Sequence, residues 1–131
     1  MRTAVWFSQY GLPDVEYFLP YKARSPVLLR VLTYQNKGDL FDEIDRLLKD
    51  KGTHKFGVGQ SLFYQLPLFC NPSVLIPNWC WEMINDYQSV KKFHIPIAKS
   101  LDSANAWQLD CFNIIDQEIT RIKNHEKIKN G

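Results

Sequence analysis

The sequence lacks most of the short motifs that identify a catalytic or metal-binding protein. Its three cysteines are an odd number, unlike the dense, even set of a disulfide-stabilised secreted domain. Neither the C-x-x-C nor the H-x-x-x-H spacing of a local metal site occurs. No apolar run reaches the roughly 20 residues that a bilayer crossing needs. We therefore expect a cytoplasmic protein with no membrane segment, no metal and no cofactor.

Charge of one sign is also scarce. The formal net charge is +2, and the last residues carry most of the excess, because four basic residues there face one acidic residue. A protein that binds nucleic acid by neutralising phosphates usually has a basic face on its folded body as well. Nucleic acid is thus not the favoured partner. In that alternative the contacts would be Arg121, Lys123, Lys127 and Lys129.

The chain does have enough apolar and aromatic residues for one core. Of its 131 residues, 45% are hydrophobic and 14% are aromatic, which is typical of a single folded domain. We predict one globular helical domain over 1–122 and a basic, frayed tail over 123–131. The expected fold is mostly α, a bundle of about five helices with room for one or two short strands. An α+β fold is the alternative.

Capping residues predict several helix boundaries. Ser25 and Pro26 are typical of an N-cap and a first helical residue, so a helix is expected from there to Gly38. This helix is apolar nearly all round and is expected to be buried. Asp39 is expected to cap a second helix that ends at Gly52. A short helical turn is expected at 13–18, and a helix is expected after Gly59. Another helix is expected to begin at Pro77-Asn78 and to be followed by an extended segment at 93–97. The last helix is expected to run from Asp102 or Ser103 toward Lys123.

Three segments allow more than one interpretation. Residues 3–8 suit a short strand or a buried helical turn. Residues 54–59 suit a loop or a strand, and 61–66 suit a helix or a strand, of which we favour a helix after Gly59. Residues 57–61 contain two glycines before a helix, as an anion-binding turn would, but a plain turn that uses left-handed glycine geometry is the favoured explanation. The charged outer face of the second helix is expected to consist of Asp42, Glu43, Asp45, Arg46 and Lys49. On this face, Asp42 and Arg46 have the spacing of an ion pair.

Cys80 is the strongest candidate nucleophile, because it lies in the first turn of a predicted helix, where the helix dipole lowers a thiol pKa. His54 and His94 are the candidate bases. Burial between two tryptophans would instead raise the pKa of Cys80. Cys111 is expected to pack in the core, and a metal site would need Cys70 and the other ligands to meet through tertiary folding. We predict no catalytic residue.

The aromatic residues suggest a binding surface. Trp79 and Trp81 point about 200° apart on a helix, so one of them is expected to face outward. Together with Tyr87 and Phe93 they form the predicted interaction patch, since exposed aromatics are enriched in binding hot spots. The alternative is that another segment of the chain covers Trp81.

These observations favour a small intracellular protein–protein interaction module. It would act as an adaptor, an inhibitor or a self-associating subunit, and its partner would be another protein or a second copy, as in a homodimer. The first alternative is a nucleic-acid-binding protein that uses the basic tail and exposed aromatics. The second alternative is a small cysteine-dependent enzyme or a ligand-binding domain, built on Cys80 or on residues 57–61.

Overall fold

The computed structural model describes residues 1–15, 17–50, 57–94 and 106–130. These residues form a mostly helical fold with one two-stranded antiparallel sheet, which confirms the predicted fold class. In chain order the elements are α1 (Arg2–Tyr10), β1 (Tyr21–Arg24), β2 (Val31–Tyr34), α2 (Lys37–Lys49), α3 (Val58–Gln65), η2 (Leu66–Leu68), α4 (Pro72–Leu75), α5 (Asn78–Phe93) and α6 (Ala106–Asn130).

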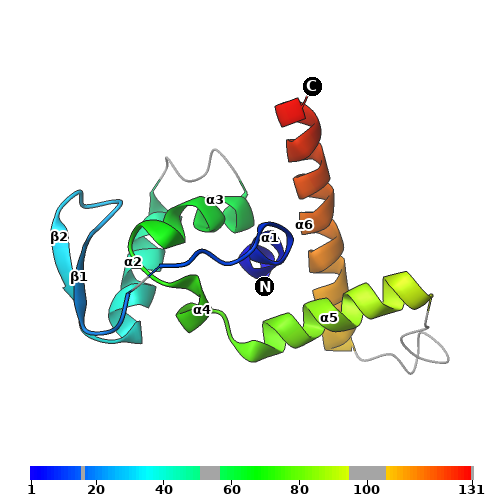
Figure 1. Ribbon diagram of the computed structural model, residues 1–131, viewed down its shortest axis with the longest axis horizontal. Helices are drawn as coiled ribbons and strands as arrows, with labels where there is room; N and C mark the ends of the chain where they lie inside the picture. Colours follow the sequence, from blue (N-terminus) through cyan, green and yellow to red (C-terminus); the bar gives the residue numbers. More distant parts are fainter. Residues whose placement is uncertain (16, 51–56, 95–105, 131) are drawn as a thin grey trace.

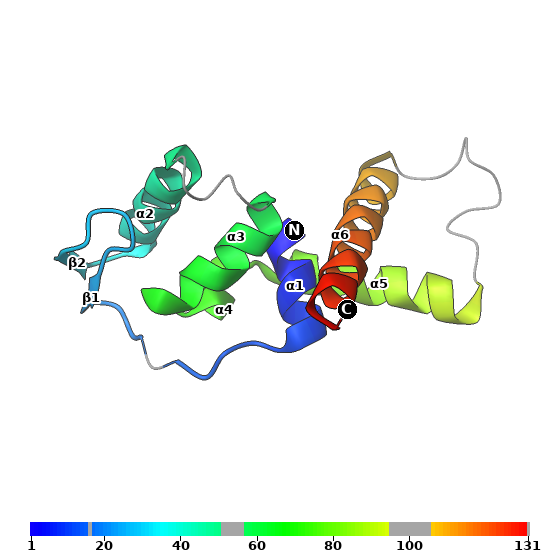
Figure 2. The same cartoon turned by 90° about the horizontal axis from the view of Figure 1, so that it is seen from above.

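Helix α1 lies at the centre of the molecule, between α3 and α6 (Figure 1). The hairpin of β1 and β2 lies with α2 at one end, and α5 and α6 form the other end (Figures 1 and 2). Residues 3–7 of α1 are all buried, because neighbouring helices cover most of its circumference. Segment 3–8 is therefore a helix and not a strand.

Two clusters of buried side chains make up the core. One joins α1, α5 and α6 and is built mainly from Ala4, Val5, Trp6, Ile84, Phe112 and Ile115. The other joins the hairpin, α2 and the segment after α3, and is built from Phe7, Tyr34, Leu40, Leu47, Leu66, Phe69 and Cys70. Phe63 and Trp81 pack against both clusters, so they connect the two ends of the molecule.

The helix predicted from Pro26 to Gly38 is wrong, because this segment forms the turn and second strand of the hairpin. The Ser25 hydroxyl does accept the Leu28 N–H at 3.0 Å, and the Ser25 carbonyl accepts the Leu29 N–H at 2.9 Å, as in a first helical turn. Leu29 then adopts a left-handed conformation with φ of 58°, which ends that turn. The Arg30 carbonyl accepts the Ser25 N–H at 2.9 Å and closes the hairpin.

Other helix predictions are confirmed with shifted boundaries. Helix α2 is capped by Asn36, whose side chain accepts the Asp39 N–H at 3.1 Å, and it ends at Lys49; Gly52 lies outside the described residues. The helices predicted after Gly59 and from Asn78 are α3 and α5. Helix α6 continues to Asn130, beyond Lys123, and its predicted cap lies outside the described residues.

Two shorter predictions are corrected. The helical turn predicted at 13–18 is not present among its described residues, which are irregular and lead into β1. The prediction that Phe93 and His94 are extended is wrong, because Phe93 is the last residue of α5 and His94 is left-handed with φ of 54°. Residues 95–97 lie outside the described ranges. No helix in the described part of the chain has the length and apolar composition of a membrane span.

Candidate interaction surface

The aromatic residues of the predicted patch lie in different environments. Trp79 is exposed and packs against Trp107 of α6, with 5.2 Å between ring centroids. Trp81 is half-buried between the two core clusters, so another part of the chain does cover it. Phe93 is exposed at the far end of α5, about 21 Å from Trp79 at 1.5 Å per residue.

Tyr87 belongs to the core. Its ring packs edge-on against Phe112 with 5.4 Å between centroids, and its hydroxyl donates to the Asp116 carboxylate. Burial and this hydrogen bond raise the pKa of Tyr87 above its usual value. The structure therefore does not bring Trp79, Trp81, Tyr87 and Phe93 together on one surface.

The cysteines are buried free thiols. Burial is the largest influence on each of them, and it raises the pKa of Cys70 to about 12. Burial also raises the pKa of Cys80 and Cys111, although the amino terminus of the chain partly offsets it at Cys80. His94 lies at the opposite end of α5 from Cys80, and His54 lies outside the described residues. The expected effect of burial on Cys80 is confirmed, and no described imidazole is placed to activate it.

Gly57 caps α3 and Gly59 lies in its first turn, and only Gly59 is needed for helix packing. Neither has a positive φ, so the expected left-handed glycine turn is wrong. Gly59 is buried, and its carbonyl accepts the Thr3 hydroxyl at 3.2 Å. An added Cβ at Gly59 would lie 2.5 Å from the Glu118 carboxylate and 3.1 Å from the Arg2 backbone. This glycine therefore allows α1, α3 and α6 to approach one another.

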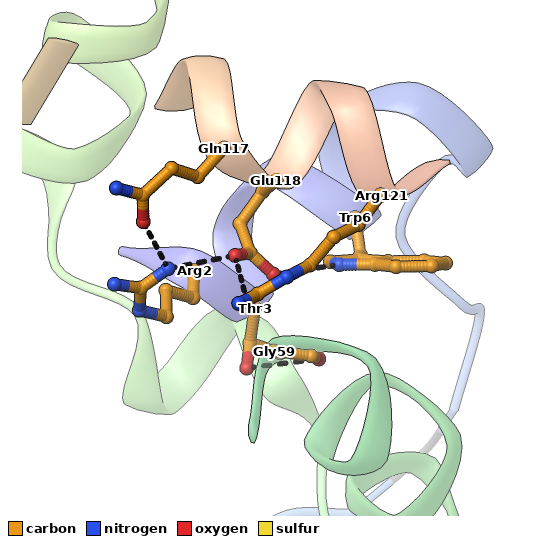
Figure 3. A network of polar contacts seen from close by, with 7 residues as sticks. All are labelled: Arg2, Thr3, Trp6, Gly59, Gln117, Glu118 and Arg121. Atoms are coloured by element: carbon orange, nitrogen blue, oxygen red, sulfur yellow. Dashed lines mark hydrogen bonds and ion pairs between the residues drawn. The ribbon is translucent and has the colours of Figure 1, made fainter. Parts of the chain in front are cut away.

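Glu118 of α6 is a completely buried carboxylate with three donors (Figure 3). Its Oε1 accepts the indole N–H of Trp6 at 3.2 Å, and its Oε2 accepts from Arg2 at 2.8 Å and from Arg121 at 2.7 Å. Arg2 also donates to Gln117 at 3.1 Å. Because each oxygen has a partner and both guanidinium groups reach solvent, this group holds α1 against α6 and has no free reactive atom.

The basic residues of α6 do not form one face. Arg121 is bound to Glu118, whereas Lys123, Lys127 and Lys129 are exposed. At about 100° per residue, Lys123 and Lys127 lie on one side of the helix, and Arg121 and Lys129 lie toward the other. This distribution does not favour a phosphate-binding surface.

A second polar group joins α1, α3 and α6 at the surface. Tyr10 donates to Glu126, and the Tyr64 hydroxyl lies 3.4 Å from His125 Nε2. Gln60 donates to the Tyr64 hydroxyl at 3.2 Å. Burial and the Glu126 contact raise the pKa of Tyr10 to about 12, so this phenol keeps its proton at neutral pH. Across the described ranges, no group of three His, Cys, Asp or Glu side chains is arranged to hold a metal ion.

A second buried carboxylate, Glu43 of α2, positions the hairpin. It was expected on the charged outer face of α2 but is completely buried. It accepts a hydrogen bond from the Ser25 hydroxyl and pairs with Arg46, whose Nε lies 2.8 Å from Oε2. Arg46 therefore pairs with Glu43 and not, as predicted, with Asp42. Glu43 thus ties the start of the hairpin turn to α2.

The outer part of the hairpin and η2 expose large apolar side chains. We call Leu28, Leu29, Val31 and Leu68 the hairpin surface. Leu29, Val31 and Leu68 are 63%, 64% and 59% exposed. Leu29 and Leu68 line the same groove, which has a volume of about 350 Å³. Sequence reasoning missed this surface because it placed Leu28 and Leu29 inside a buried helix.

Leu29 is the most unusual residue of this surface. Its left-handed backbone costs a residue with a Cβ about 1 to 2 kcal/mol, and glycine or asparagine normally occupies such a position. Large apolar residues at an exposed turn also add nothing to the core. The chain thus holds a leucine side chain in solvent at a conformation that leucine disfavours.

Comparisons with protein-family models, with curated proteins and with solved structures found no match to this chain.

Proposed function

We propose that this protein is a protein–protein interaction module whose partner binds the hairpin surface. The observation that carries the proposal is the exposure of large apolar side chains around the left-handed Leu29. Exposed apolar side chains that line one groove, as Leu29 and Leu68 do, mark sites of association. Backbone strain also concentrates at functional sites, where surrounding structure maintains it.

The rest of the described structure supports a binding role over a catalytic one. The thiols are buried and have raised pKa values, and the carboxylates Glu43 and Glu118 are fully bound by neighbouring side chains. Among the described residues, the groove that Leu29 and Leu68 line is open to solvent, so it suits the side chains of a partner. We place the module in the cytoplasm, where a reducing environment agrees with three free cysteines.

Differential capture tests the proposal. The full chain, immobilised, is exposed to an extract of the cells that produce it, beside a variant that carries Leu29→Asn and Leu68→Gln. Asparagine accepts the left-handed conformation, so this variant is expected to fold. The control variant carries Phe93→Gln and Ile128→Asn, which remove equally exposed apolar groups elsewhere.

We expect the wild-type and control columns to retain a protein whose affinity for the hairpin variant is at least tenfold lower. The reason is that truncation of a hot-spot residue costs about 2 kcal/mol or more of binding free energy. Urea midpoints verify that both variants are folded. The proposal is wrong if the three columns retain the same proteins with equal affinity, or if the wild type retains none that the hairpin variant loses.

A further inference from the structure

Within the described ranges, neither strand of the hairpin pairs with a further strand, and the register shows which backbone groups face outward. Residue pairs in an antiparallel ladder alternate between hydrogen-bonded and non-hydrogen-bonded. Ser25 and Arg30 are opposite each other and hydrogen-bonded, so the pairs Arg24–Val31 and Lys22–Thr33 are non-hydrogen-bonded. The N–H and C=O groups of these four residues therefore point away from the hairpin.

The two edges differ in how well they are protected. On β1, the residues with outward backbone groups are Lys22 and Arg24, and exposed charged side chains discourage pairing with another strand. On β2, they are Val31 and Thr33, which are exposed, uncharged and β-branched, a type that favours strands. Strand β2 also lies farther from α3 than β1 does (Figures 1 and 2). The β2 edge is therefore the one open to pairing.

The groove between β2 and α2 carries two aspartates, whereas Lys22 and Arg24 lie across the hairpin from Thr33 and Val31. A groove of about 160 Å³ between β2 and α2 is lined by Leu32, Thr33, Tyr34, Asp39, Asp42 and Arg46. The guanidinium of Arg46 is already paired with buried Glu43. The two aspartates therefore give the groove a net negative charge, which a lysine or arginine of a partner would complement.

We propose that β2 accepts an extended segment of a partner protein as a third strand, and that this segment carries β-branched residues and at least one lysine or arginine. The inference rests on the proposed function, because β2 includes Val31 of the hairpin surface. Backbone hydrogen bonds to Val31 and Thr33 would supply affinity, and the acidic groove would supply selectivity. A second copy of this chain is a poorer occupant, because it would bring its own Asp39 and Asp42 toward the same groove.

Matched proline variants test the backbone pairing. Thr33→Pro removes only an outward N–H, and Leu32 before it is already extended, as a residue preceding proline must be. Lys22→Pro makes the same change at the paired position on the other edge. The probes are a fluorescent peptide of alternating valine and lysine and its counterpart with glutamate in place of lysine, with binding measured by fluorescence anisotropy.

We expect the lysine peptide to bind the wild type saturably and the glutamate peptide to bind at least tenfold more weakly. Thr33→Pro is expected to weaken binding of the lysine peptide about tenfold or more, while Lys22→Pro leaves it within about twofold. Asp42→Asn should weaken it several-fold at low salt, whereas Asp45→Asn, outside the groove, should not. These two variants keep the test valid if a proline variant unfolds.

Three results would overturn the inference. The first is that the lysine and glutamate peptides bind with equal affinity. The second is that Asp42→Asn and Asp45→Asn lower the affinity for the lysine peptide equally. The third is that the chain forms a concentration-dependent dimer that Thr33→Pro abolishes. The partner captured by the wild type separates this inference from the proposed function. If Leu29→Asn with Leu68→Gln loses that partner and Thr33→Pro retains it, the interaction module stands and the pairing at β2 does not.

Discussion

Replacement of Glu118 by glutamine tests whether the buried carboxylate stabilises the junction of α1 and α6. Glutamine has the same shape, and its oxygen can still accept the Trp6 indole N–H. Its amide nitrogen would take the place of Oε2, which accepts from Arg2 at 2.8 Å and from Arg121 at 2.7 Å. Two charge-assisted hydrogen bonds would then be lost, and donor groups would face each other.

The expected cost follows from the exposure of the partners. Hydrogen bonds to charged groups contribute about 1.5 to 3 kcal/mol each, so their combined loss is about 3 to 6 kcal/mol. Arg2 and Arg121 are 35% and 51% exposed, so water recovers part of this loss. The glutamine also avoids the cost of burying a charge. We expect Glu118→Gln to lower the free energy of unfolding by about 2 to 4 kcal/mol.

Urea unfolding measures this change. With a slope of about 2 kcal/mol per molar urea, the midpoint should fall by about 1 to 2 M. Glu82→Gln is the matched control, because Glu82 is exposed on α5 and the change should stay within about 0.5 kcal/mol. Equal midpoints for Glu118→Gln and Glu82→Gln would refute the argument that the carboxylate stabilises the fold.

Three further substitutions test the packing of the core by the same urea assay. Gly59→Ala should lower the free energy of unfolding by about 1 to 3 kcal/mol, because the added Cβ would lie 2.5 Å from a buried carboxylate. Gly57→Ala is the control and should be close to neutral, because its Cβ would lie 3.4 Å from its nearest neighbour. Cys70 has its pKa raised from 9.0 to about 12, so the unfolded thiol ionises first. The stability that this thiol contributes should be constant well below pH 9 and fall by at most about 4 kcal/mol as pH rises toward 12, and Cys70→Ala should remove that part of the slope. The Tyr34 hydroxyl is buried with no hydrogen-bond partner in the described structure, so Tyr34→Phe should leave the free energy of unfolding equal or up to about 1 kcal/mol higher. By contrast, Tyr21→Phe removes a 2.7 Å hydrogen bond to a backbone carbonyl and should lower the free energy of unfolding by about 1 kcal/mol.

Local sequence signals predicted most of the helices because those signals act within one or two turns. The apolar spacing of α2, the Pro77-Asn78 start of α5 and the long apolar stripe of α6 each appear within their own segments. The hairpin could not be predicted in this way. The Ser25-Pro26 start does form one helical turn, and the decisive contribution is the pairing of Tyr21–Arg24 with Val31–Tyr34, which no helical pattern in 26–38 reveals.

The buried carboxylates show a similar limit. A glutamate on a helix is normally assigned to its solvent face, and for Glu118 the partner Arg2 is separated by 116 positions in the sequence. Nothing near Glu118 indicates this contact except Arg121, one turn later. For Glu43, the basic residue three positions later was a usable signal, because Arg46 can pair with either Glu43 or Asp42.

Buried Glu43 also explains why the turn that carries Leu29 is held in place. Ser25 is the residue that opens the hairpin turn, and its hydroxyl is held by Glu43, which is in turn held by Arg46. Folding this turn back to bury Leu29 would break the hydrogen bond to a buried carboxylate, at a cost of about 1 to 3 kcal/mol, against a gain of about 1.5 to 3 kcal/mol from burying a leucine. The anchor at Ser25 therefore opposes burial of Leu29. A partner would meet the hairpin surface already ordered, and would lose little of its binding free energy to arranging it.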